Sequence, residues 1–145
     1  MKTAIVYYSK HHENTKKLLD AIAQKNDVTL IDVTKNPITD LSEYDCIGFA
    51  SGIYYSKFQK GLLEYAQKYM PDNKKTFFIY TCGAKKNTYT KSIIQAINKH
   101  NPTVLGEFGC CGYDTFGPFK LIGGIGKGHP DDTDIANVLA FYEKL

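Results

Sequence analysis

Apolar, β-type runs alternate with amphipathic helical patterns along most of the chain. The runs that predict strands are Ala4–Tyr8, Val28–Val33, Cys46–Ala50, Thr76–Tyr80 and Val104–Gly109. The patterns that predict helices are Thr15–Lys25, Lys57–Tyr69, Thr88–Lys99 and Asp132–Lys144. The segment Lys35–Tyr44 contains Pro37 and short polar turns, so it has room for a brief helix at most.

Apolar strands separated by helices predict a fold of the α/β class. Strands this apolar favour a parallel sheet that is buried on both faces. Right-handed crossovers then give a doubly wound sandwich of three layers. In such a sandwich a ligand binds at the carboxyl ends of the strands, where the strand order reverses. The length of 145 residues, without repeats or a linker, predicts one domain over residues 1–145.

The composition indicates a globular protein of the cytoplasm. Apolar residues make up 43% and charged residues 23%, as is typical of soluble domains. No apolar run approaches the roughly 18 residues of a membrane span, and the first run is too short for a signal peptide. Cys46 and Cys82 lie in strand-like runs, and the adjacent Cys110 and Cys111 cannot join without strain. We therefore expect reduced thiols and a cytoplasmic location.

The loop after the first strand has the character of a phosphate site. A polar stretch from Ser9 to Thr15 separates the strand from an amphipathic helix. The first turn of a helix leaves N–H groups without helical partners, and its dipole makes that end electropositive. Ser9, Asn14 and Thr15 add hydroxyl and amide donors at the same place, which favours a phosphate group. Asn14 and Thr15 would also suit a plain helix cap.

Three further loops follow strands that end at the same predicted edge. The segments are Ser51–Ser56, Thr81–Asn87 and Gly112–Phe119, all rich in Gly, Tyr or Phe. A flat aromatic cofactor with a phosphate tail would match these loops together with the first one. Gly52 and Gly83 would let the backbone approach a ligand closely, and Gly52 would let a peptide change its orientation. Taken singly, these glycines and tyrosines also fit ordinary turns and surface grooves.

With these loops, the chain resembles the flavodoxin family over essentially its whole length. The first loop reads S-x-H-H-x-N-T, and Lys127-Gly128-His129-Pro130 before the last helix is similar to flavodoxin-like relatives. The resemblance implies a flavodoxin-like fold with a five-stranded parallel sheet of order 2-1-3-4-5, and non-covalent FMN. It implies no catalytic side chain, because FMN itself does the redox chemistry. The residues it implies for cofactor binding are Ser9, Lys10, His11, His12, Asn14, Thr15, Ser51, Gly52, Ile53, Tyr54, Tyr55, Thr81, Cys82, Gly83, Ala84 and Tyr113.

The chain departs from the family pattern in three ways. Glu13 stands where related loops often have glycine, so its carboxylate either points to solvent or weakens phosphate binding. Trp is absent, so other aromatic side chains must flank the ring. The candidates for that role are Tyr54, Tyr55, Tyr113, Phe116 and Phe119. The formal net charge is +3, where most flavodoxins are strongly acidic.

These features favour an electron carrier that serves redox partner proteins, and the lysines near the ligand loops favour acidic ones. The alternative is an FMN-dependent oxidoreductase that acts on a quinone or a porphyrin-like compound. A phosphoryl receiver is rejected, because Ala50-Ser51 and Ser9-Lys10 stand where it needs aspartates. A net charge of +3 without any arginine does not favour nucleic-acid binding.

The sequence also gives expectations for metal binding and for single cysteine and histidine residues. Without a C-x-x-C pair, and with His11 and His12 pointing different ways, no metal site is expected. Cys82 ends a buried strand and is expected to be structural. His100 and His129 are expected at the surface.

Overall fold

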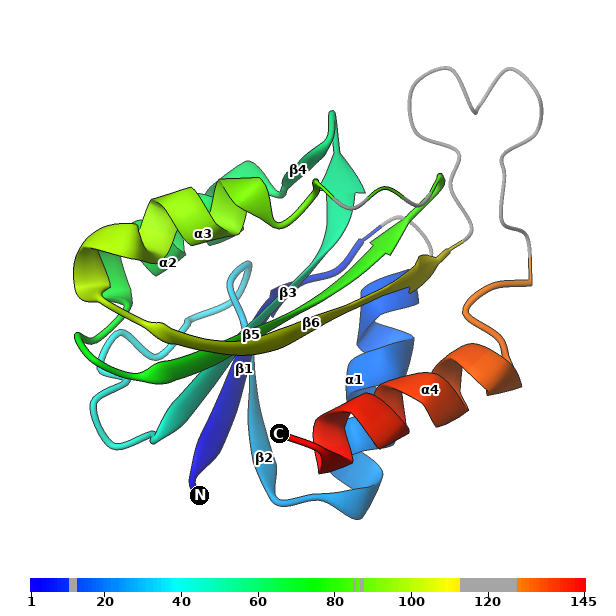
Figure 1. Ribbon diagram of the computed structural model, residues 1–145, viewed down its shortest axis with the longest axis horizontal. Helices are drawn as coiled ribbons and strands as arrows, with labels where there is room; N and C mark the ends of the chain where they lie inside the picture. Colours follow the sequence, from blue (N-terminus) through cyan, green and yellow to red (C-terminus); the bar gives the residue numbers. More distant parts are fainter. Residues whose placement is uncertain (11–12, 85, 87, 113–127) are drawn as a thin grey trace.

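A parallel sheet forms the centre of the molecule. The computed structural model describes residues 1–10, 13–84, 86, 88–112 and 128–145. Within these ranges the parallel strands lie in the order β2-β1-β3-β5-β6 (Figure 1). Their bounds are β1 (Thr3–Tyr8), β2 (Val28–Asp32), β3 (Cys46–Tyr54), β5 (Lys75–Cys82) and β6 (Thr103–Cys111). The predicted order 2-1-3-4-5 is confirmed, with β5 and β6 as its fourth and fifth strands.

Helices cover both faces of this sheet, as the alternating pattern predicted. They are α1 (Asn14–Lys25), α2 (Lys60–Tyr69), α3 (Lys91–Ile97) with the short η1 (Asn98–His100), and α4 (Asp132–Glu143). Helices α1 and α4 lie on one face, and α2 and α3 on the other (Figure 1).

The side chains of alternate residues in each strand pack into two separate hydrophobic cores, one on each face of the sheet. Val6 and Phe49 pack with Leu62 in the core under α2 and α3. Ile5 packs with Leu18 in the core under α1 and α4. A fully buried side chain of this size contributes roughly 1.5–3 kcal/mol, so both layers are firmly attached to the sheet.

Strand β3 is longer than predicted. It runs four residues past Ala50, because it turns back on the short antiparallel strand β4 (Lys57–Phe58). The connecting Tyr55 and Ser56 have φ values of 49° and 66°, the double positive φ of a type I′ hairpin turn. The prediction of a helix from Lys57 was therefore wrong at its start. Helix α2 begins at Lys60, where the Gln59 side chain accepts a hydrogen bond from the Leu62 N–H (2.9 Å).

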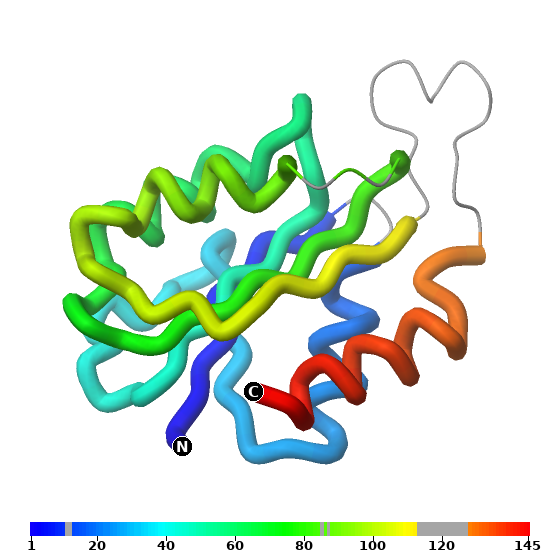
Figure 2. Tube along the Cα trace, viewed as in Figure 1, coloured from blue at the N-terminus to red at the C-terminus, as the bar shows by residue number. Residues whose placement is uncertain are grey.

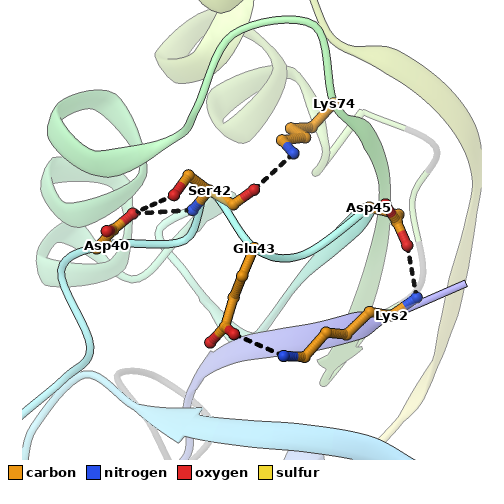
Figure 3. A network of polar contacts seen from close by, with 6 residues as sticks. All are labelled: Lys2, Asp40, Ser42, Glu43, Asp45 and Lys74. Carbon is orange, nitrogen blue, oxygen red and sulfur yellow. Dashed lines mark hydrogen bonds and ion pairs between the residues drawn. The ribbon is translucent and has the colours of Figure 1, made fainter.

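The segment between β2 and β3 contains no helix among its residues, all of which are described. Two aspartates instead fold it into turns, in which Asp32 accepts from Thr34 and Asp40 accepts from Ser42. Polar contacts fasten its end to the amino edge of the sheet (Figure 3). They are Lys2 Nζ to Glu43 (2.6 Å), Lys2 N–H to Asp45 (2.8 Å) and Lys74 Nζ to the Ser42 carbonyl (2.9 Å).

Both chain termini lie at this amino edge of the sheet (Figure 2). Met1 and Leu145 line the same surface hollow there. No disulfide joins the four cysteines, all of which are described. Among the helices described, none has the length and apolar character needed to cross a membrane.

Candidate functional site

The carboxyl ends of the strands meet at one edge of the sheet, as expected. Register pairs Tyr8 with Ser51, Ser51 with Tyr80, and Tyr80 with Gly109, so the ends of β1, β3, β5 and β6 stand in one row. The strand order reverses between the neighbouring strands β1 and β3. This is the place where an open α/β sheet forms a ligand crevice.

The first loop folds tightly over the start of α1. The Glu13 N–H donates to the Lys10 carbonyl (3.2 Å), and the Lys16 N–H donates to Ser9 Oγ (3.1 Å). Ser9 and Lys10 thus stand beside the electropositive end of a twelve-residue helix. His11 and His12 lie outside the described residues.

Glu13 occupies a backbone conformation that explains why glycine suits this position. Its φ of 52° lies in the left-handed region, which is costly for a residue with a Cβ. The residue is exposed at the surface, one position before α1. Of the two alternatives, the exposed position favours a carboxylate that points to solvent.

Two contacts tie the start of α1 to the end of β5 and to the residue that follows β6. Thr15 Oγ1 lies 2.9 Å from Thr81 Oγ1, and both threonines are buried. Gly112 packs so closely on Asn14 that a Cβ at residue 112 would lie 2.5 Å from Asn14 Nδ2. The Gly112 N–H also donates to the Cys82 carbonyl (3.0 Å). These contacts hold three segments of the edge in a fixed relation.

The segment Ser51–Ser56 is a strand end and hairpin, not the irregular loop that the sequence suggested. Ser51 is fully buried; its hydroxyl donates to the Gly52 carbonyl and accepts from the Gln59 N–H (3.1 Å). Gly52 pairs with Thr81 inside the sheet. Ile53 pairs with Phe58 across the hairpin.

The two adjacent tyrosines of this hairpin differ sharply. Tyr54 is partly buried, and its ring meets that of Tyr8 edge to face at 6.0 Å between centroids. Lys10 Nζ lies 6.0 Å from the centre of the Tyr8 ring. Tyr55 sits at the tip of the turn and is 82% exposed. Tyr54 is thus built into the edge, while Tyr55 projects from it.

Hydrogen bonds from two tyrosine hydroxyls hold the loop after β5 in place. Tyr89 donates to the Ala84 carbonyl, and Tyr80 donates to the Lys86 carbonyl (3.3 Å). Burial raises the pKa of Tyr80 to about 12, so its hydroxyl stays a donor at neutral pH. Gly83 and Ala84 are the accessible members of Thr81–Ala84.

Cys82 is buried and donates to the Cys110 carbonyl (3.6 Å), which agrees with a structural role. Tyr113, Phe116 and Phe119 lie outside the described residues, and so do Lys85 and Asn87. Tyr8 and Tyr89 belong to the edge but were not among the predicted site residues, whereas Gly112 was predicted as the first residue of the loop Gly112–Phe119. Tyr8 ends a strand, so its position alone could have indicated it.

Neither of the two histidines expected at the surface is simply exposed. The His100 imidazole is only 15% exposed and bonds Asp72 (2.8 Å) and the Gln67 carbonyl (2.9 Å). His129 Nδ1 bonds Asp134 Oδ2 (2.8 Å), and this bond raises the pKa of His129. His129, Asp131 and Asp134 bring three possible metal ligands within 4.8 Å. Both carboxylates already act in the capping box of α4, so the cluster is explained without an ion.

Comparisons with known proteins match this architecture. A family profile described as "Flavodoxin domain" matches residues 5–117. The chain belongs to the flavodoxin family. An uncharacterized protein of Methanocaldococcus jannaschii is 36% identical over 147 residues, which cover 100% of this chain and 98% of that protein.

Solved structures support the fold. A short-chain flavodoxin associated with a bacterial microcompartment superposes with a TM-score of 0.68 at 17% identity, covering 100% of this chain and 97% of that one. A flavoprotein from Lactobacillus acidophilus, solved in complex with FMN, gives a TM-score of 0.57 at 18% identity and covers 74% of this chain and 92% of that one. An archaeal flavodoxin gives 0.61 at 18% identity, with 98% of this chain and 97% of that chain covered.

Proposed function

We propose that this protein binds FMN non-covalently at the carboxyl edge of its sheet and carries electrons between redox partner proteins. The observation that supports this most is the Thr15–Thr81 hydrogen bond of 2.9 Å. It joins a donor-rich helix start to the strand end next to the β3 hairpin, so a phosphate site and a ring site adjoin. Membership of the flavodoxin family agrees with such a ligand.

The residues present suit the phosphate end of FMN. Ser9 and Thr15 supply hydroxyls, Asn14 an amide and Lys10 a cation, all beside the N-terminus of α1. Hydrogen bonds from such donors to a charged phosphate are the stronger kind. Glu13, exposed one residue before the helix, does not remove this fit.

The residues present also suit the ring end. Gly52 leaves the strand end without a side chain, and Tyr54 and Tyr8 offer aromatic surface beside it. Gly83 and Ala84, which follow β5 and are accessible, offer backbone groups on the opposite side of β3 from β1. The chain's own part is to bind, orient and partly shield the ring.

FMN, when bound, supplies the redox chemistry, and no side chain needs to act as acid or base. The protein then serves as a carrier whose exposed hairpin meets the partner. Reduction of a quinone or a porphyrin-like compound by the same site is the competing function.

A reductive titration of the FMN-loaded protein tests the proposal. The chain is saturated with FMN, titrated anaerobically with dithionite, and followed by its visible spectrum. A carrier is expected to take up its electrons in two separate one-electron steps and to pass them to a one-electron protein acceptor. A single two-electron step, together with multiple turnovers of a quinone, would favour the enzyme instead.

A further inference from the structure

The charges of this chain are unevenly distributed along the sequence. Residues 46–106 contain nine of the eighteen basic residues but only two of the fifteen acidic ones. This stretch supplies the whole layer of α2 and α3 and the β4 hairpin (Figure 1). Within the layer itself, β4, α2, α3 and η1 carry Lys57, Lys60, Lys68, Lys91 and Lys99 against the single acidic residue Glu64. This layer is therefore basic.

A surface groove of about 530 Å³ lies in this basic layer, next to the proposed FMN site. It is lined by Ser56, Lys57, Leu63, Thr88, Lys91, Ser92 and Gln95. Its described lining thus consists of two lysines, hydroxyl and amide groups and one leucine, without a carboxylate. The nearby Glu64 of α2 is in an ion pair with Lys60 (3.9 Å).

The groove is held open by contacts between its walls. Ser92 of α3 accepts a hydrogen bond from the Phe58 N–H of β4 (3.1 Å) and donates to the Tyr89 carbonyl (3.3 Å). Phe58 is buried against Phe78 and Tyr80 of β5. The hairpin and α3 are thereby fixed to one another, and no rearrangement is needed to form the groove.

The groove also adjoins the most exposed aromatic residue of the site. Ser56 lines the groove, and its neighbour Tyr55 is 82% exposed at the hairpin tip. Tyrosine is one of the residue types that are enriched in protein interfaces. Tyr54, the next residue back along β3, belongs to the ring end of the site.

We infer that this groove docks an acidic segment of a partner protein, with carboxylates at Lys57 and Lys91 and an apolar contact at Tyr55. This inference rests on the proposed function for its role, because a partner held there would face the ring end of the FMN site. The basic layer would steer such a partner toward the hairpin. A nucleic acid fits less well, since the chain has no arginine to grip phosphates bidentately.

Chemical-shift mapping on the full chain tests the inference, with and without saturating FMN. The probes are a Glu-rich peptide, its Gln-for-Glu counterpart of equal length, and a single-stranded DNA oligonucleotide. The Glu-rich peptide is expected to shift the amide signals of Ser56, Lys57, Thr88 and Lys91, and its binding should weaken as salt rises from about 0.02 M to about 0.3 M. The Gln peptide is expected to leave these signals unchanged.

Paired variants locate the charges. Lys57→Gln with Lys91→Gln should weaken the Glu-rich peptide about fivefold or more, the effect of losing two partly exposed ion pairs. The matched control is Lys68→Gln with Lys99→Gln, which removes the same net charge from the far end of the same layer. The control should change the affinity less than twofold.

Three results would overturn the inference: shifts that map away from the groove, equal losses in the two double variants, or tighter binding of the DNA oligonucleotide. A chain that binds the peptide in the groove but not FMN would overturn the proposed function and leave the docking site standing. A chain that binds FMN but not the peptide would do the reverse.

Discussion

The buried contact between Thr15 and Thr81 gives the sharpest mutational test of how the site is assembled. The two hydroxyls lie 2.9 Å apart, and the residues are only 1% and 4% exposed. Thr15→Val or Thr81→Val replaces one hydroxyl by a methyl group of similar size. The remaining hydroxyl is then buried beside an apolar group.

The burial of both hydroxyls determines how much unfolding free energy each variant should lose. A buried polar group that loses its partner costs roughly 1–3 kcal/mol, whereas replacing both partners by apolar groups of the same shape is nearly neutral. Each single variant should therefore lose about 1–3 kcal/mol of unfolding free energy. The double variant should lose less than either single one, so the coupling energy between the two sites is large and favourable.

Urea unfolding of the four proteins without FMN, followed by circular dichroism, measures these free energies. The slope with urea should be the same for all four, so that the midpoints report stability alone. Single variants within about 0.5 kcal/mol of the wild type, or losses that simply add in the double variant, would refute the direct contact.

Three further predictions concern Gly112, Glu13 and His129. Gly112→Ala should cost roughly 1–3 kcal/mol in urea unfolding, because its Cβ would lie 2.5 Å from the Asn14 side chain; Gly52→Ala, with its nearest contact at 3.6 Å, is the matched control and should cost less. Glu13→Gly should stabilise the chain by up to about 1 kcal/mol by relieving the left-handed backbone, and Glu13→Ala should not, so equal effects would assign the change to the charge. His129 should titrate above 6.5 by NMR, since Asp134 favours its charged form. Its contribution to stability is then full below about pH 6.5 and is lost as the pH rises through the raised pKa, so thermal unfolding of His129→Gln should differ most from the wild type near pH 5 and least at pH 9.

The alternation of apolar runs and helical patterns was enough to predict the layers and the edge at which the strand ends meet, whereas the strand order came from the resemblance to the flavodoxin family. Strand β1 and helix α1 agree with their predicted bounds to within one residue. This works because burial on both faces leaves a strong, continuous apolar signal.

The hairpin after β3 was missed for a physical reason. Its turn has Tyr55 and Ser56 at positive φ. The sequences that usually indicate such a turn are Asn-Gly and Asp-Gly, and neither is present here. Without such a turn sequence, Gly52 to Ser56 was interpreted as a loop and Lys57 as the start of a helix. The segment between β2 and β3, which had room for a brief helix at most, has none, because Asp32 and Asp40 hold turns of their own.

Close approaches between segments were also beyond the sequence. The Thr15–Thr81 contact and the packing of Gly112 on Asn14 join residues more than sixty positions apart. Only the register of the sheet brings them together. The left-handed backbone of Glu13 likewise accompanies the hydrogen bond from its N–H to the Lys10 carbonyl. No local sequence pattern predicts this bond.

The central claim is that the start of α1 and the ends of β3 and β5 form one FMN site, and calorimetric titration of the chain with FMN and with riboflavin tests it most directly. Each charge-assisted hydrogen bond to the phosphate is worth roughly 1.5–3 kcal/mol, so FMN should bind at least about tenfold more tightly than riboflavin. Equal affinities for FMN and riboflavin, or no binding of FMN, would contradict the account.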